Sequence, residues 1–165
     1  MRELQLAPLS TDAFKPFGEV IDSEVPCEKI AINEGNTLRH HALAQVDCAE
    51  ADGSAAISLF RAQPIDSSFV LRFMERHPLG SQAFINTGGN PYVIVVAPPG
   101  DLDETAIRGF IAKPSQGVSY RRGTWHHYLM ALQKPSDFVV VDRVGPGNNC
   151  DEQTLSEPIQ LVLTP

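Results

Sequence analysis

Short segments of alternating apolar and polar residues, separated by glycine and proline, run along the whole chain. This alternation is typical of strands with one buried face, and turn signals at roughly 8–12-residue spacing favour a β-sandwich or barrel. One segment, 91–97, is apolar throughout, which predicts a strand buried on both faces. We expect strands at 4–9, 20–21, 28–33, 36–46, 55–61, 69–77, 82–86, 91–97, 107–112, 117–120, 128–132, 137–142 and 159–163.

Helical signals are few and short. Ser10 is a suitable N-cap before a brief segment at 11–14, which should end near Pro16. Segments 101–106 and 151–155 are each expected to form a turn or two of helix. A chain of 165 residues, 42% of them hydrophobic, is expected to form a single domain with a substantial core. The predicted fold class is therefore all-β with a few short helices, in one domain over residues 1–165.

The charge balance excludes several classes of partner. With 13 basic and 20 acidic residues the net charge is −7, which argues against nucleic-acid binding. Apolar runs stay well short of the ~20 residues that a membrane span needs. The start of the chain, 1–5, lacks the apolar core of a signal peptide. The three cysteines, Cys27, Cys48 and Cys150, form no CxxC pair and are expected to be free thiols in a reducing compartment. These features predict a protein of a reducing compartment that binds neither nucleic acid nor a membrane.

The first candidate site lies at the end of the segment 69–77. Strict alternation from Phe69 would place Glu75 and His77 on the core-facing side of the strand. Buried carboxylate and imidazole groups are costly unless they are paired or bind a ligand. The turn at 78–80 is expected to form a hairpin that brings Gln82 back beside His77. These groups suit a divalent metal or a small oxygenated anion, although a polar hairpin rim is an equally simple interpretation.

The second candidate site is the segment 123–127, Gly-Thr-Trp-His-His. Neighbouring residues on a strand face opposite sides, so only one of His126 and His127 is expected to point inward. The other is expected on the surface or behind the site. A single histidine here also fits a purely structural role.

Together the two segments resemble the cupin barrel, whose motifs carry metal-binding histidines. Gly123-x-x-His126 is similar to the end of the second cupin motif. His77-x4-Gln82 is similar to the second histidine and the acid of the first motif, with Gln82 in the place of the acid. Glu75 stands where the first histidine would be. The resemblance implies a cupin-like, jelly-roll antiparallel β-barrel, with His77, Gln82 and His126 as metal ligands.

A narrower resemblance covers nearly the whole chain. The sequence is similar to the ureidoglycolate lyase family, cupin-like enzymes of allantoin degradation and purine nitrogen metabolism. This resemblance implies cleavage of (S)-ureidoglycolate to glyoxylate and urea by a cytoplasmic homodimer. It also favours nickel as the divalent metal, and the chemistry needs no organic cofactor. The matching stretches are 61–64, 75–85, 117–120, 125–127, 142–143 and 149–151.

The residues can be assigned roles in such a reaction. The elimination needs a base for the substrate hydroxyl, an acid for the departing nitrogen and a cation for the carboxylate. His126 is the expected base, and Glu75 or His77 the expected acid. Gln82 and Tyr120 are expected substrate-binding residues. Among the arginines, Arg61 is favoured as the clamp on the carboxylate, because a guanidinium grips a carboxylate with two hydrogen bonds.

Two other classes of function remain open. A different metal cupin, such as a dioxygenase or a sugar isomerase, would normally use a fuller set of histidine and glutamate ligands. A non-enzymatic module that binds a small oxo or hydroxy acid would use the same barrel without turnover. Release of urea and glyoxylate from ureidoglycolate separates both of these from the lyase.

Overall fold

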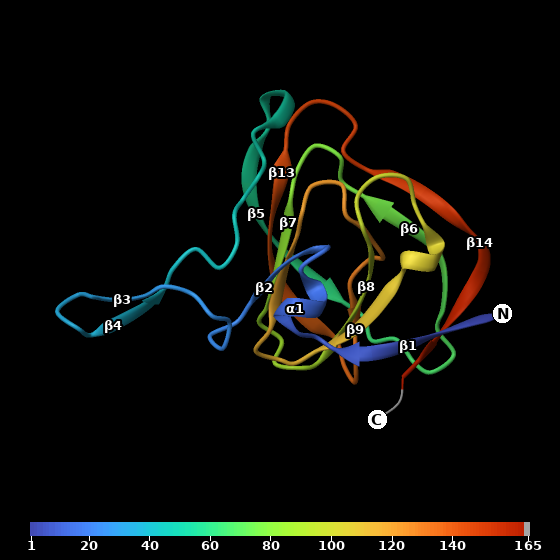
Figure 1. Cartoon of the computed structure of the whole chain (residues 1–165), viewed down its shortest axis with the longest axis horizontal. Coiled ribbons are helices and arrows are strands. Elements are labelled where there is room, and N and C mark those ends of the chain that lie inside the picture. Colours follow the sequence, from blue (N-terminus) through green and yellow to red (C-terminus); the bar gives the residue numbers. More distant parts are fainter. Residues whose placement is uncertain (164–165) are drawn as a thin grey trace.

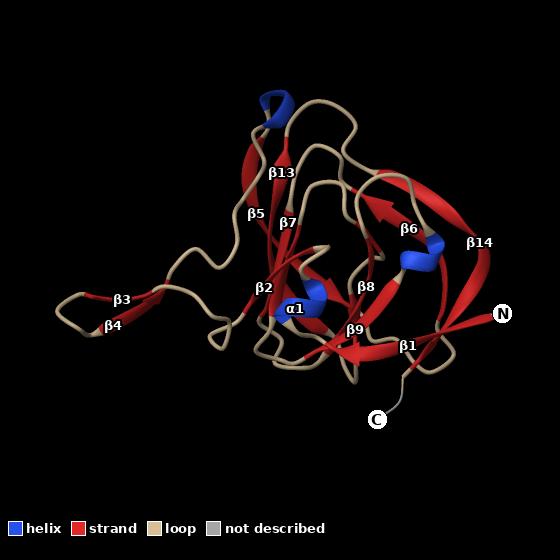
Figure 2. Cartoon of the chain, viewed as in Figure 1, coloured by secondary structure: helices blue, strands red, loops and turns tan. Residues whose placement is uncertain are grey.

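The computed structural model describes residues 1–163, and strands make up about half of this part of the chain (Figure 2). Helical elements are short: α1 (Thr11–Phe14) and the 3-10 turns η1 (Glu50–Asp52) and η2 (Glu104–Ala106). The Ser10 hydroxyl accepts a hydrogen bond from the Ala13 N–H, so the predicted N-cap is confirmed. Among the described residues, none of the helices has the length and apolar character that crossing a bilayer requires.

The first sheet closes on itself into a small barrel. Its seven strands follow the order β11-β6-β14-β1-β9-β8-β12, and β11 also pairs with β8, which completes the ring. In Figure 1, β6, β14, β1, β9 and β8 surround one side of the molecule. The strands are β1 (Arg2–Pro8), β6 (Val70–Arg76), β8 (Tyr92–Ala97), β9 (Arg108–Ala112), β11 (Trp125–His126), β12 (Met130–Ala131) and β14 (Asp151–Val162).

The second sheet packs against one side of this barrel. Its order is β2-β10-β7-β13-β5, with antiparallel pairing throughout. Figure 1 shows β13 and β7 running side by side. The strands are β2 (Gly18–Ile21), β5 (Ser54–Ala62), β7 (Gln82–Asn86), β10 (Gly117–Tyr120) and β13 (Ser136–Val144).

The strand β8 separates two hydrophobic cores. Val93, Val95 and Ala97 belong to the core inside the barrel. Tyr92, Ile94 and Val96 alternate with them and join the core between the two sheets. All six residues are buried, so the predicted strand with two buried faces is confirmed. β-Branched side chains suit this position because they pack well on a pleated surface.

The helix α1 closes one end of the core between the sheets. Phe14 is fully buried, and its ring centroid lies 5.8 Å from that of Phe17 and 5.9 Å from that of Phe110. Gly18 follows, and a Cβ there would lie 1.9 Å from the Ser119 carbonyl oxygen. Strand β2 can therefore pair closely with β10 only because this position is glycine.

A two-stranded arm projects away from the two sheets (Figure 1). It consists of β3 (Lys29–Ile32), the turn 33–36 and β4 (Thr37–His40), and its strands pair with each other. Segment 36–46 was expected to be strand, but only its first part is; the remainder leads back to the body.

The expectation of an all-β barrel with few short helices is confirmed, and three further local expectations differ from the structure. Segment 151–155 is the start of β14 and not a helical turn, because it pairs with β6 along its length. Strand β1 pairs in parallel with both of its neighbours, so the barrel sheet is mixed. Strict alternation in β6 is also wrong, since Leu71 and Met74 both fill the barrel core. The pairing of β6 with β14 is irregular next to this point, with extra residues on β14 between Thr154 and Ile159.

Phe14→Ala should lower the free energy of unfolding by about 3–5 kcal/mol, because it opens a cavity between the two sheets. Urea denaturation measures this change. Asp12→Ala, an exposed position on the same helix, is the matched control and should change stability by less than about 0.5 kcal/mol. Equal effects of the two substitutions would contradict this assignment of the core.

Candidate active site

His126 lies at the position where the barrel closes. It pairs with Glu75 of β6 on one side and with Val96 of β8 on the other. Its neighbour Trp125 fills the barrel core, so alternation turns the His126 side chain toward the second sheet. Gly123, with φ +76°, makes the turn before this strand, and its N–H donates to the His77 carbonyl. The two segments found in the sequence are therefore joined through their backbones.

Three side chains meet at this position. His126 Nε2 lies 3.5 Å from Glu75 Oε1, and the ring centroids of His77 and His126 are 4.9 Å apart. One ligand atom from each of Glu75, His77 and His126 lies within 4.8 Å of the others. Carboxylate and imidazole ligands suit a divalent metal, so these three residues form a candidate metal-binding group.

Both imidazoles are held by backbone carbonyl groups. His77 Nδ1 lies 2.6 Å from the Asn149 carbonyl oxygen, and His126 Nδ1 lies 3.0 Å from that of Thr124. A carbonyl only accepts, so each Nδ1 carries the proton and each Nε2 offers a lone pair in the neutral ring. This arrangement of the second nitrogen is also typical of metal-bound histidines. The Nε2 atoms are thus prepared to bind a proton or a cation.

The surroundings shift the ionisation of the cluster. When the His126 ring is protonated, its Nε2 donates to Glu75, and this contact lowers the pKa of the Glu75 carboxyl, although burial opposes the shift. Burial and the nearby charge of His126 lower the pKa of His77. Near neutral pH this favours an ionised Glu75 beside a neutral His77, which are the forms that accept protons.

The cluster opens into a cavity of about 290 Å³ between the two sheets. Glu75 and His126 contribute to it from the barrel, and Gln82 contributes from β7. Apolar side chains form much of the remaining wall, so a small polar ligand would meet its polar contacts at one end. The other lining residues are Phe60, Arg61, Ala62, Phe84, Tyr128 and Leu129.

Gln82 reaches the cavity by a different route from the one expected. Strands β6 and β7 belong to different sheets, so they form no hairpin. Segment 78–80 instead carries the chain from the barrel to the second sheet, and the Leu79 N–H donates to Asn149 Oδ1 along the way. Gln82 is buried, and its Nε2 donates to Asp142 Oδ2 at 3.0 Å. Its amide oxygen therefore remains available as an acceptor.

Tyr120 lies behind His126 and is not among the residues that line the cavity. The two rings stack with centroids 4.6 Å apart and an interplanar angle of 28°. Burial raises the pKa of the Tyr120 hydroxyl, so it stays protonated. The structure places this side chain as a support for the His126 ring.

The guanidinium of Arg61 is engaged outside the cluster. Its Nε and Nη2 donate to the two carboxylate oxygens of Asp137, at 2.7 and 2.9 Å. Arg61 and Asp137 are directly opposed across β5 and β13. Phe60 and Ala62 alternate with Arg61, and Ala62 belongs to the core between the sheets. Arg61 thus contributes to the cavity wall while its side chain extends along the opposite face of the sheet.

His127 is buried on the opposite face from His126, so only His126 points toward the cavity, as expected, and His127 lies behind the site and not on the surface. Its exposed fraction is 3%, and its ring packs on Phe73 with centroids 4.9 Å apart. Its Nδ1 lies 3.1 Å from the Phe73 carbonyl oxygen, while its buried Nε2 has no partner. Burial lowers the pKa of His127 to about 4. Both histidines are enclosed because each face of β11 is covered, one by the second sheet and the other by the barrel.

Several residues near the cluster were not anticipated from the sequence. Asp142 holds Gln82, while Arg143 donates to the backbone carbonyls of Glu50, Ala51 and Pro146. Asp142 lies two residues after the apolar Val140 on a predicted strand, and this spacing could have indicated that both face the core. Glu152 is directly opposite Glu75, and Cys150 lies close to both carboxylates. The pairing of Glu152 with Glu75 was not expected because segment 151–155 was predicted to be helical.

The comparisons with known proteins identify the family. The ureidoglycolate lyase family model matches residues 1–162. The chain belongs to the ureidoglycolate lyase family. Ureidoglycolate lyase from Pseudomonas syringae pv. tomato is 50% identical, over 100% of this chain and 97% of that protein. Ureidoglycolate lyase from Pseudomonas fluorescens Pf-5 is 48% identical, over 100% of this chain and 99% of that protein.

A solved structure supports the cupin-like fold of this ureidoglycolate lyase family member. A dTDP sugar isomerase from Desulfovibrio desulfuricans G20 superposes with a TM-score of 0.50 at 13% identity. The match covers 84% of this chain and 85% of the isomerase. At this identity the likeness shows the fold alone, and it agrees with the jelly-roll resemblance of the two motifs.

His127→Leu should weaken the pH dependence of stability between about pH 4 and 6.5. The pKa of His127 is near 4 in the folded protein and about 6.5 in the unfolded chain. Within that window the unfolded chain binds more protons, so stability falls as the pH falls, by up to about 3 kcal/mol. Urea denaturation at pH 7 and pH 4.5 measures the difference. An unchanged difference in the His127→Leu variant would contradict the prediction.

Proposed function

We propose that this protein cleaves (S)-ureidoglycolate to glyoxylate and urea at the Glu75–His77–His126 cluster. The observation that carries the proposal is the pair of imidazoles whose Nδ1 atoms are held by backbone carbonyls, beside a carboxylate, at the end of a cavity. The choice of ureidoglycolate as the substrate is based on family membership over residues 1–162. Relatives that carry the name ureidoglycolate lyase match this chain along its whole length.

The chemistry requires only proton transfers. The reacting carbon of ureidoglycolate carries a hydroxyl, a ureido nitrogen and a carboxylate. In the elimination the O–H bond breaks, a C=O bond forms and the C–N bond breaks, while the departing nitrogen gains a proton. We assign the removal of the hydroxyl proton to His126 Nε2. Glu75 or His77 then accepts that proton from His126 and passes it to the departing nitrogen, and such general acid–base groups contribute about 10²–10⁴-fold each.

Two further residues position the reacting groups. The Gln82 Nε2 atom is held by Asp142, which leaves the amide oxygen to accept a hydrogen bond from the substrate hydroxyl. Tyr120 stacks on His126, and we propose that it fixes the plane of that ring. The predicted contact between Tyr120 and the substrate also remains part of the proposal. It is supported by the 4.6 Å separation between the ring centroids of Tyr120 and His126.

The cluster also fits a divalent cation. His77 and His126 present Nε2 lone pairs, and Glu75 presents a carboxylate within reach of both. Gln82 would add an amide oxygen from the facing strand. The family resemblance favours nickel, and a bound divalent cation would acidify the substrate hydroxyl. Elemental analysis of the purified protein tests this assignment.

The remaining expectations concern assembly and compartment. On the family resemblance we propose that the protein works as a homodimer in the cytoplasm. The free state of Cys27, Cys48 and Cys150 supports a reducing compartment.

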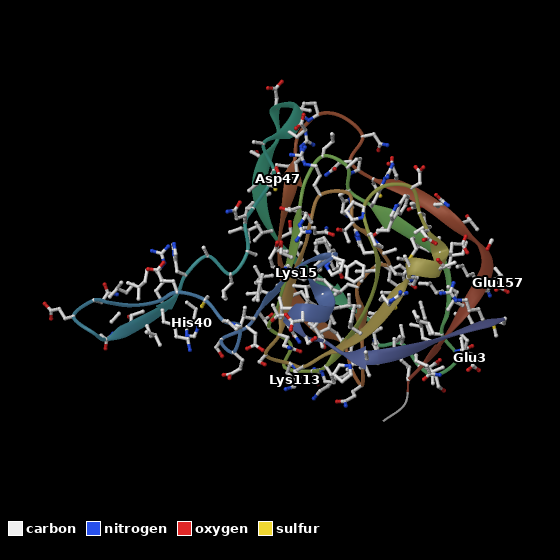
Figure 3. The ribbon with its side chains drawn as sticks, viewed as in Figure 1. Glu3, Lys15, His40, Asp47, Lys113 and Glu157 are labelled. Carbon is white, nitrogen blue, oxygen red and sulfur yellow. The ribbon has the colours of Figure 1, made fainter. Side chains whose placement is uncertain are left out.

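Purified protein incubated with racemic ureidoglycolate should release equal amounts of glyoxylate and urea from one enantiomer. His126→Ala and His77→Ala should each lower kcat/KM by about 100-fold or more, because each removes a proton-transfer group. Circular dichroism checks their folding. His40→Ala is the matched control, since this histidine lies on the projecting arm (Figure 3) and should leave turnover unchanged. Ammonia and carbon dioxide in place of urea, or full turnover by the two folded variants, would contradict the proposal.

Arg61→Ala should change the KM for ureidoglycolate by less than about threefold. A change this small indicates that Arg61 lines the cavity without binding the substrate directly. The reason is that Asp137 already occupies both arms of the guanidinium. Steady-state kinetics measure this value, with Gln82→Leu as the comparison that should raise KM. A KM increase of about tenfold or more in Arg61→Ala would restore Arg61 as the carboxylate clamp.

A further inference from the structure

The projecting arm, residues 29–40, lacks a partner of its own within residues 1–163. Its two strands form a separate two-stranded sheet. Figure 1 shows it extending well away from the rest of the molecule. Leu38, which faces the same side of the arm as its partner Ala31, is 55% exposed. An isolated hairpin is marginally stable in water, so an arm of this kind needs another surface to pack against.

The second sheet has an apolar outer face. The register aligns Leu59, Val139 and Ile85 in one row across β5, β13 and β7. Ile57 and Val141 stand side by side in the neighbouring row. Both rows alternate with residues of the core between the sheets, so they lie on the face turned away from the barrel. This face continues from β7 to the edge of the sheet at β5.

Only part of this face is covered by the chain itself. Segment 43–46 lies over the middle strands, where it forms a trough of about 270 Å³ with Ala83, Ile85 and Val141. Toward the edge of the sheet, Ile57 is 78% exposed and Leu59 is 64% exposed. Adjacent exposed apolar side chains on a strand edge mark an interaction surface or an aggregation risk.

We propose that the outer surface of β5 and β13 is the homodimer interface, and that the arm of each copy packs across these strands in the other copy. The inference rests on the homodimer of the proposed function and names the surfaces that form it. A twofold axis lets each copy donate its arm and accept the other arm. Both uncovered surfaces are then buried in one step.

The dimensions of the sheet indicate why the arm is needed. Five strands about 4.8 Å apart, and at most about 30 Å long, span an outline of roughly 700 Å² at most, and segment 43–46 already covers the middle of this face. Stable interfaces bury about 800 Å² on each partner, so the sheet face alone is too small. The arm supplies the remaining area. The Arg61–Asp137 ion pair lies on the same face, where it would form part of a polar rim around the apolar centre.

The same strand carries the interface and one wall of the cavity. Leu59 faces outward, while Phe60 and Ala62 line the cavity between the sheets. Packing of a partner arm on β5 would therefore hold the cavity wall in place. This gives the exposed apolar residues a role in the shape of the proposed active site.

Leu59→Asp and Leu38→Asp test the two halves of the interface separately. Each should raise the dimer dissociation constant by about 100-fold or more, as central apolar interface residues do. Sedimentation velocity across a concentration series measures this constant, and circular dichroism checks folding. Val144→Asp is the matched control: it is 50% exposed on β13 but alternates with the outward-facing Arg143, and it should remain dimeric.

Hydrogen exchange then tests the arm itself. Amides of residues 29–40 should be protected in the wild-type dimer and should exchange rapidly in Leu59→Asp. Dimers of unchanged affinity in both variants would overturn this interface while leaving the homodimer intact. A monomeric wild-type protein would overturn the homodimer and the interface together. If the Leu59→Asp variant is monomeric but the amides of residues 29–40 exchange hydrogen as slowly as in the wild type, the arm does not pack on the other copy. Urea release, measured independently, reports on the lyase activity in every case.

Discussion

The closure of the barrel through β11 is the constraint on which the rest of the structure depends. This strand is only two residues long, and it joins β6 to β8 to complete the ring. Trp125 points into the barrel and anchors the strand by burial, so His126 must point toward the second sheet. The position of the proposed base is therefore set by packing on the opposite face of the same strand.

The polar groups at the site are held mainly by backbone atoms. The carbonyls of Asn149 and Thr124 accept from the two imidazoles, and the Gly123 N–H donates to the His77 carbonyl. Such contacts cost little conformational entropy during a reaction because the strands and turns that supply them are already ordered. They also fix which nitrogen of each ring is free. A cluster of this kind can accept a proton or a divalent cation with the same geometry.

The second sheet has different functions on its two faces. Its inner face completes the cavity through Gln82, Phe84 and Phe60. Its outer face carries exposed apolar residues and the Arg61–Asp137 pair. Neighbouring residues of a strand point to opposite faces, so consecutive residues of β5 can serve the cavity and the outer surface in turn. Arg61 belongs to segment 61–64, one of the stretches that resemble the family. Its side chain lies on the outer face and pairs with Asp137, so a role on the sheet surface explains this residue better than contact with the substrate.

Local sequence patterns by themselves determined most of the strands, the capped helix α1, the two-sided burial of β8 and the two segments that carry the site. These features follow from periodicity and from residue chemistry over a few positions. Only the tertiary structure decided which sheet each strand joins. It separated β6 from β7, made 151–155 a strand that places Glu152 opposite Glu75, enclosed His127 and directed Arg61 to Asp137. The physical reason is that pairing partners and register depend on contacts between residues far apart in the chain, which a local pattern does not contain.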